Sequence, residues 1–86
     1  MRKPNVIATV VNNAREQVRV SLGWYQGHDL IDVRITVELN AETNAMVPTK
    51  KGFSLRVEKL PELIAALRRA LDEARRRGLL DKKELA

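Results

Sequence analysis

Two stretches in the first half of the chain alternate between apolar and polar residues with a period of two. Their apolar positions are Val18, Val20, Leu22 and Trp24 in residues 17–25, and Ile31, Val33, Ile35, Val37 and Leu39 in residues 29–39. Because neighbouring side chains of a strand point to opposite faces of a sheet, this period predicts two half-buried strands. Gln26-Gly27 lies between them, and glycine can take the positive φ that a tight turn needs. The pattern therefore predicts a β-hairpin.

Two further segments favour strands. Residues 6–11 are rich in β-branched residues and are followed by Asn12-Asn13, a pair typical of turns. Residues 40–45 form a polar connection, and residues 46–55 form a shorter and less regular run. Pro48 in this run cannot donate a ladder hydrogen bond, so it favours the start of a strand or an edge of the sheet.

The last third of the chain has the spacing of an amphipathic helix. Its apolar positions are Leu60, Leu63, Ile64, Leu67, Leu71 and Ala74. Pro61 is tolerated only in the first turn, which places the helix start between Val57 and Leu60. Gly78 is placed to cap the helix after a run of arginines, and residues 79–80 are expected to fold back onto the last turn. Residues 81–86 are expected to fray.

The order of these elements predicts an α+β fold of four antiparallel strands and one C-terminal helix, in a single domain over residues 1–80. A four-stranded sheet presents an apolar face about 19 Å wide. One helix is about 10 Å across and covers half of such a face. A second copy of the chain is the obvious cover for the rest, so we expect a homodimer whose contacts and core involve Trp24, Leu63, Leu67 and Leu71.

Composition excludes several kinds of site. The chain has no cysteine and one histidine, which rules out thiolate chemistry and zinc sites built on cysteines or several histidines. No glycine-rich phosphate loop or paired catalytic groups are evident, so we expect neither an enzyme, a cofactor nor a small-molecule substrate. The apolar run at Val6–Val11 is too short for a signal peptide or a membrane span, which favours a cytoplasmic protein, nucleoid-associated in a bacterium. The net charge of +5 suits an anionic partner such as nucleic acid.

Two motifs in this order resemble a known family. They are LIDVR at Leu30–Arg34 and PTKKGFSL at Pro48–Leu55, followed by the amphipathic helix. From Val18 to Leu71, about two thirds of its length, the chain resembles the transcriptional coactivator family called positive cofactor four. The resemblance implies a strongly curved antiparallel sheet, a homodimer, and grooves that bind single-stranded DNA or melted duplex with little sequence preference. It looks like a compact bacterial or phage member, because the Ser-rich acidic extension of eukaryotic members is not found here.

The resemblance also implies which residues contact the nucleic acid. The family's pattern has an aromatic residue at Tyr25 and basic residues at Gln26, His28, Arg34, Lys50 and Lys51. This chain departs from the pattern at Gln26 and His28, which carry no fixed charge, and also at Gly23, Val37 and Val47. An aromatic residue of the family's best-known members falls on Val37, and basic residues fall on the other two.

Each of these residues also has a simpler interpretation. By alternation, Trp24 lies on the apolar face and Tyr25 on the polar face, where Tyr25 either stacks on bases or packs across the hairpin. Arg19 and Arg34 either contact phosphate or pair with Glu38 or Asp32, and Asp32 is expected to orient Arg34.

Other residues also have an interpretation that involves no ligand. Lys50 and Lys51 either contact phosphate or protect a sheet edge, and His28 is expected to be an exposed turn residue. Gly52 allows either the approach of a ligand or a bulge. We interpret Arg68, Arg69 and residues 75–77 as a solvated helix face with ion pairs.

The leading hypothesis is a homodimer that binds single-stranded DNA in transcription, replication or repair. Lys50, Lys51 and Arg34 would hold phosphates while Tyr25 stacks on bases, with Arg19, His28 and Gln26 as further contacts. Single-stranded RNA is an alternative ligand, because stacking on a sheet serves either nucleic acid. A protein–protein interaction or scaffold domain that has kept the fold is the alternative from another class, and the lost aromatic at Val37 favours it.

Overall fold

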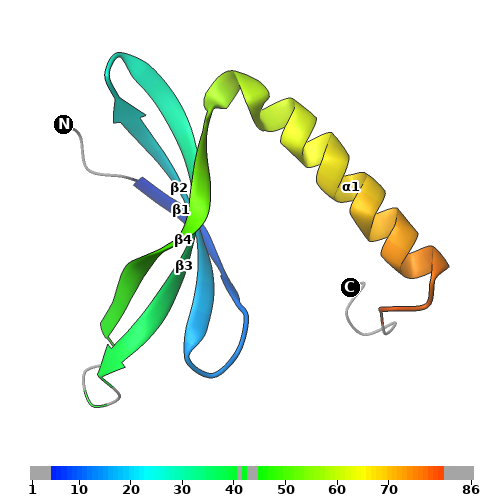
Figure 1. The fold of residues 1–86 in the computed structure, drawn as a ribbon, viewed down its shortest axis with the longest axis horizontal. Coiled ribbons are helices and arrows are strands. Elements are labelled where there is room, and N and C mark those ends of the chain that lie inside the picture. The colour runs from blue at the N-terminus through cyan, green and yellow to red at the C-terminus, as the bar shows by residue number, and fades with distance from the viewer. Residues whose placement is uncertain (1–4, 41, 43–44, 81–86) are drawn as a thin grey trace.

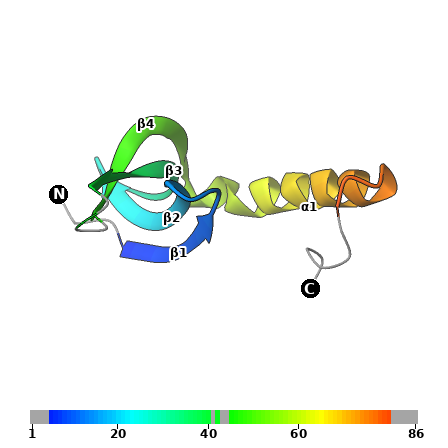
Figure 2. The same cartoon turned by 90° about the horizontal axis from the view of Figure 1, so that it is seen from below.

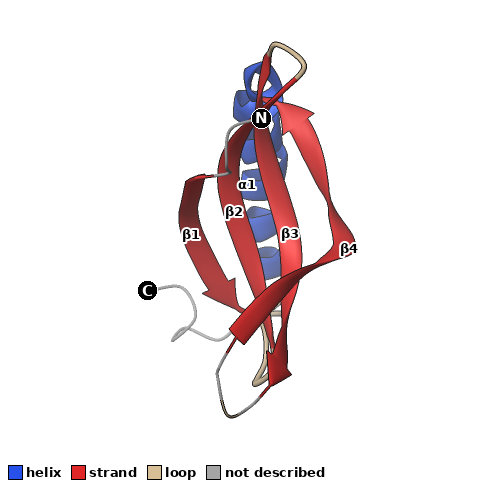
Figure 3. Cartoon of the chain, turned by 90° about the vertical axis from the view of Figure 1, so that its left-hand side faces the viewer, coloured by secondary structure: helices blue, strands red, loops and turns tan. Residues whose placement is uncertain are grey.

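One antiparallel sheet with strand order β1-β2-β3-β4 is followed by a single long helix (Figure 1). The computed structural model describes residues 5–40, 42 and 45–80. Its strands are β1 (Asn5–Val11), β2 (Glu16–Tyr25), β3 (His28–Asn40) and β4 (Ala45–Arg56). The predicted order of four strands and a helix is confirmed, and β1 and β4 lie at the two edges of the sheet (Figure 3).

The predicted hairpin is formed by β2 and β3. Val20 lies opposite Val33 and Leu22 opposite Ile31, so the apolar positions of the two strands share one face. The two-residue turn has positive φ at both positions, 49° at Gln26 and 83° at Gly27. Such turns match the right-handed twist of the strands, which is why they dominate short hairpins.

Burial in the sheet is concentrated at its centre. Ile31 is 3% exposed on the apolar face, while Ser21 and Thr36 are buried on the polar face. The sheet itself is strongly curved (Figure 2). The Thr36 hydroxyl donates to the Gln17 carbonyl, which satisfies a buried polar group within the sheet.

The helix begins and ends close to the predicted residues. A short 3-10 turn, η1 (Val57–Lys59), leads into α1 (Leu60–Arg76), and Pro61 lies in the first turn. Gly78 has φ 71°; its N–H donates to the Arg75 carbonyl, and the Leu79 N–H donates to the Ala74 carbonyl. This pair of hydrogen bonds is a Schellman cap, which confirms the predicted role of the glycine. The expected fraying falls on residues 81–86, which lie outside the described residues.

The helix extends away from the sheet and buries none of its residues (Figures 1 and 2). Only its N-terminal half borders the apolar face, across an open apolar groove of about 350 Å³. The groove is lined by Ile7, Val20, Leu22, Ile31, Val33, Leu60, Leu63, Ile64 and Leu67. The chain's own helix therefore leaves more of the face uncovered than the half we expected. Within the described residues, α1 is also too short and too polar to cross a membrane.

Candidate nucleic-acid interface

The polar face of the sheet brings together most of the predicted contact residues. Arg19 on β2 lies opposite Arg34 on β3, and Tyr25 lies opposite His28 at the end of the hairpin. Residues directly opposite each other in an antiparallel pair share a face. These side chains therefore lie on one surface, called here the polar sheet face together with Asp32 and Ser54.

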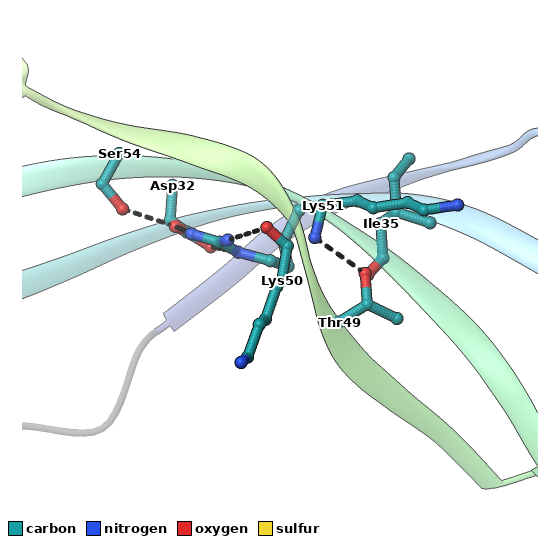
Figure 4. A network of polar contacts seen from close by, with 7 residues as sticks. Asp32, Ile35, Thr49, Lys50, Lys51 and Ser54 are labelled. Carbon is teal, nitrogen blue, oxygen red and sulfur yellow. Dashed lines mark hydrogen bonds and ion pairs between the residues drawn. The ribbon is translucent and has the colours of Figure 1, made fainter.

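The two predicted lysines lie on a bulge of β4. Pro48 lies opposite Thr36 and Gly52 opposite Arg34, so residues 49–51 together face Ile35 alone. Thr49 fixes the bulge: its Oγ1 donates to the Ile35 carbonyl at 2.9 Å and accepts the Lys51 N–H at 3.1 Å (Figure 4). We call Thr49, Lys50 and Lys51 the β4 bulge.

Gly52 ends the bulge in a conformation that demands glycine. Its φ is +146°, and a Cβ built there would lie 2.3 Å from the Val33 carbonyl oxygen and 2.8 Å from the Arg34 Cα. No side chain fits that space without moving the backbone of β3. Of the two roles left open by the sequence, the structure supports the bulge, because the close approach is to β3.

An ion pair lies along β3 on the polar sheet face, next to the bulge. Arg34 donates from Nη2 to Asp32 Oδ1 at 2.6 Å and from Nε to Asp32 Oδ2 at 3.4 Å. Ser54 on β4 donates its Oγ–H to the same Asp32 Oδ1 at 2.6 Å, and Arg34 Nη1 donates to the Lys50 carbonyl at 3.3 Å (Figure 4). The expected orienting role of Asp32 matches this geometry, and of the two simpler pairings it is the one with Asp32 that forms.

The network changes the proton affinities of both partners. Partial burial raises the pKa of Asp32, but the hydrogen bonds from Arg34 and Ser54 and the charge of Arg34 outweigh it, so that pKa lies below its ordinary value. The hydrogen bond to Asp32 raises the pKa of Arg34 further. Both groups are therefore charged at neutral pH.

Several predicted contacts are available to a ligand. Lys50 and Lys51 are exposed and point in different directions (Figure 4), and Tyr25 is 51% exposed. Gln26 and His28 are exposed beside it, and Gln26 donates from Nε2 to the Tyr25 hydroxyl at 3.4 Å.

Arg19 and Arg34 differ in how they are held. Arg19 is half-buried and makes no side-chain hydrogen bond or ion pair within the described part of the chain. Arg34 has five N–H donors, of which three are engaged by Asp32 and Lys50. Two donors therefore remain for a ligand.

The other predicted residues lie elsewhere. Trp24 is half-buried, and because it is two residues after Leu22 on β2 the alternation places it on the apolar face. Leu63 is half-buried on α1. Leu67 and Leu71 are exposed on the same helix.

The arginines near the end of α1 belong to a separate, solvated surface. Arg75 pairs with Asp72 at 3.8 Å, Arg77 pairs with Glu73 at 2.7 Å, and Arg76 also pairs with Glu73. This confirms their interpretation as helix ion pairs. The hydrogen bonds from Arg76 and Arg77 lower the pKa of Glu73.

Thr49 and Ser54 are not among the contact residues predicted from the sequence. Their roles depend on which β3 residue each one meets, and the bulge decides that register. The only sequence signal is a hydroxyl residue on either side of KKGF, which is weak. Among the residues that the structure describes, no three His, Asp or Glu side chains gather to hold a metal ion.

Comparison with known proteins gives matches to one family. Residues 12–66 match the family described as Transcriptional Coactivator p15 (PC4). The tetragonal crystal structure of BPSL1147, a PC4 homologue from Burkholderia pseudomallei, has 35% identity and a TM-score of 0.71, with 79% of this chain and 97% of that chain covered. A bacteriophage T5 homologue of PC4, implicated in recombination-dependent DNA replication, has 25% identity and a TM-score of 0.64, with 86% and 83% covered. A search of curated proteins found no match.

Proposed function

The chain belongs to the PC4 family, and from this membership we propose that it binds single-stranded DNA on the polar sheet face with little sequence preference. The binding would serve transcription, replication or repair by holding melted DNA. The phage homologue, which is implicated in recombination-dependent DNA replication, supports replication among these processes.

The observation that carries the proposal is a group of exposed cations at the β4 bulge together with an exposed tyrosine at the β2–β3 turn. Lys50 and Lys51 are both exposed on the bulge, Arg34 keeps two free donors next to it, and Tyr25 is exposed on the same sheet face. Cationic groups hold phosphates without regard to sequence, and a tyrosine ring stacks on any base. This combination suits a non-specific single-strand binder.

A homodimer is part of the proposal. Ile64, Leu67 and Leu71 are 43%, 60% and 39% exposed along α1, and the first two of them line the open apolar groove. A helix with no buried residue gains little from its own chain, since most helical stability comes from packing an apolar face. A second copy would cover both surfaces.

The test is fluorescence anisotropy of a labelled dT 20-mer across a range of salt concentrations, with the matching duplex and RNA as parallel arms. Tyr25→Ala should weaken binding by about 1–3 kcal/mol without changing the salt dependence, and Tyr25→Phe should retain most of it. Lys50→Ala/Lys51→Ala should reduce the log–log salt slope by about 1.4, since each phosphate contact to a single strand contributes about 0.7.

The control removes the same charge elsewhere. Arg76→Ala/Arg77→Ala takes two positive charges from the far end of α1 and should leave the slope nearly unchanged. Equal, weak binding to all three nucleic acids, unaffected by the sheet substitutions, would refute the proposal. Preference for the RNA arm would replace DNA with RNA as the ligand on the same face.

A further inference from the structure

A carboxylate lies at the centre of the surface proposed to bind a polyanion. Asp32 is on the polar sheet face, its side chain is 29% exposed, and its pKa keeps it ionised. Charge alone predicts that Asp32 weakens DNA binding and that its removal strengthens it. The contacts of Asp32 lead to the opposite expectation.

Asp32 joins two strands and orients one arginine. Its Oδ1 accepts hydrogen bonds from Arg34 on its own strand and from Ser54 on β4, both at 2.6 Å. Together with the longer bond from Nε, this two-point contact holds the planar guanidinium in one orientation. In that orientation Nη1 points at the Lys50 carbonyl, 3.3 Å away.

The Lys50 carbonyl belongs to the part of β4 that has left the ladder. Among the described residues, three hydrogen bonds that involve a side chain hold the bulge. The Thr49 hydroxyl donates to the Ile35 carbonyl, the Lys51 N–H donates to the Thr49 hydroxyl, and the Arg34 guanidinium donates to the Lys50 carbonyl. The first two fix the ends of the bulge, and the third holds its middle. An Arg34 side chain freed from Asp32 loses the restraint that directs it to Lys50, because a long, partly exposed side chain otherwise samples several rotamers.

We propose that Asp32 is a positioning residue, which acts through Arg34 to hold the backbone at Lys50, so that neutralising Asp32 weakens single-stranded DNA binding although it removes a negative charge. This inference rests on the proposed function for its DNA readout. Because the ion pair is partly exposed, the expected loss is modest, roughly threefold in affinity.

The experiment compares Asp32→Asn with Glu38→Gln by the same anisotropy titration. Glu38 alternates onto the polar face of β3, and its side chain makes no hydrogen bond or ion pair within the described residues, so it is a charge-matched control. Asp32→Asn should weaken binding roughly threefold, while Glu38→Gln should leave it unchanged or tighten it. If Asp32→Asn tightens binding as Glu38→Gln does, the inference is wrong.

Two further variants test the route through Arg34. In an Arg34→Met background, Asp32→Asn should no longer weaken binding, since the group that it positions is gone; a persisting loss would overturn the inference. Ser54→Ala removes a hydrogen bond to Asp32 without changing charge, and it should weaken binding in the same direction.

A readout without DNA separates this inference from the proposed function. Amide hydrogen exchange should become faster at Lys50 and Lys51 in Asp32→Asn, and stay unchanged at Ile31 in the sheet centre. Faster exchange together with a wild-type protein that binds no DNA would refute the proposed function and support the positioning role. Unchanged exchange at the bulge would refute the positioning role whatever the DNA result.

Discussion

Replacing Gly52 with alanine should destabilise the protein through a single methyl group. The new Cβ would lie 2.3 Å from the Val33 carbonyl oxygen and 2.8 Å from the Arg34 Cα, both of which are backbone atoms of β3. A flexible side chain could move aside, but the backbone of a central strand cannot do so without breaking ladder hydrogen bonds. The φ of +146° is a second obstacle, because residues with a Cβ rarely adopt it.

The two contributions set the size of the effect. Backbone in a region reserved for glycine costs about 1–3 kcal/mol, and forcing extra volume into a filled space costs about 1–3 kcal/mol more. The sum, about 2–6 kcal/mol, is a large part of the roughly 5–15 kcal/mol that keeps a domain folded. For a domain of this size the smallest value corresponds to a fall in Tm of about 8–16 °C.

Thermal and urea denaturation, followed by circular dichroism at one protein concentration, measure the effect. Gly23→Ala is the matched control, because a Cβ at Gly23 in the same sheet meets nothing within 4 Å and its φ is not positive. Alanine is about 0.5–1 kcal/mol better than glycine inside a strand, so Gly23→Ala should be neutral or stabilising. If Gly52→Ala lowers the Tm by less than about 4 °C, the steric reasoning fails.

Four other predictions concern the turn, the charge pattern, the helix and acid. Gln26→Asn should stabilise the protein by about 0.5–1 kcal/mol in thermal denaturation, because asparagine tolerates the positive φ of this turn better; an unchanged Tm would contradict this. Gly23→Arg adds a cation beside Tyr25 and should steepen the salt slope of DNA binding by about 0.7, whereas a steady slope would place the ligand elsewhere. Leu67→Glu should convert a dimer to monomers in sedimentation, and the wild-type Tm should rise with protein concentration; a wild-type monomer would contradict both. The lowered pKa of Asp32 contributes stability that is complete above the ordinary carboxyl pKa near 4 and is lost as pH falls through the lower pKa of the folded state. In urea denaturation, the free energy of unfolding should therefore fall less on acidification in Asp32→Asn than in wild type.

The hairpin and the helix could be predicted from sequence because each is specified locally. The Gln26-Gly27 turn determines which residues of β2 and β3 meet, and the alternation then assigns every side chain to a face. The positions of Pro61 and Gly78 mark the two ends of the helix in the same local way. By contrast, β4 was expected over residues 46–55 as a short, irregular run and extends over Ala45–Arg56, because the bulge interrupts the alternation without ending the strand.

Only the part of the candidate site that depends on alternation within one β-strand could be predicted from the sequence. Alternation places Tyr25 and Arg34 on the polar face, and it places Asp32 two residues from Arg34 on the same face. The partners Ser54 and the Lys50 carbonyl depend on the register between β3 and β4. That register follows from the number of residues in the bulge, which a motif of consecutive lysines does not reveal.

The bulge resolves a conflict that the sequence contains. Two consecutive lysines in an unbroken strand point to opposite faces, so one of them would lie on the apolar face. The bulge takes Lys50 and Lys51 out of the ladder, and the conformation of Gly52 returns the strand to it, so that Phe53 lies opposite Val33.

Gly52 therefore lets the strand keep Lys50 and Lys51 in the bulge while the residues after it return to the apolar alternation of the sheet. Asp32 restrains only the exposed middle of the bulge, through Arg34. The two substitutions should separate accordingly. Gly52→Ala should reduce stability and DNA binding together, because it shifts the backbone of β3 as well as the bulge. Asp32→Asn should reduce DNA binding with a much smaller change in Tm at neutral pH, since partly exposed ion pairs contribute little to folding. Equal losses of stability in the two variants would mean that the ion pair, and not the glycine, holds β4 on the sheet.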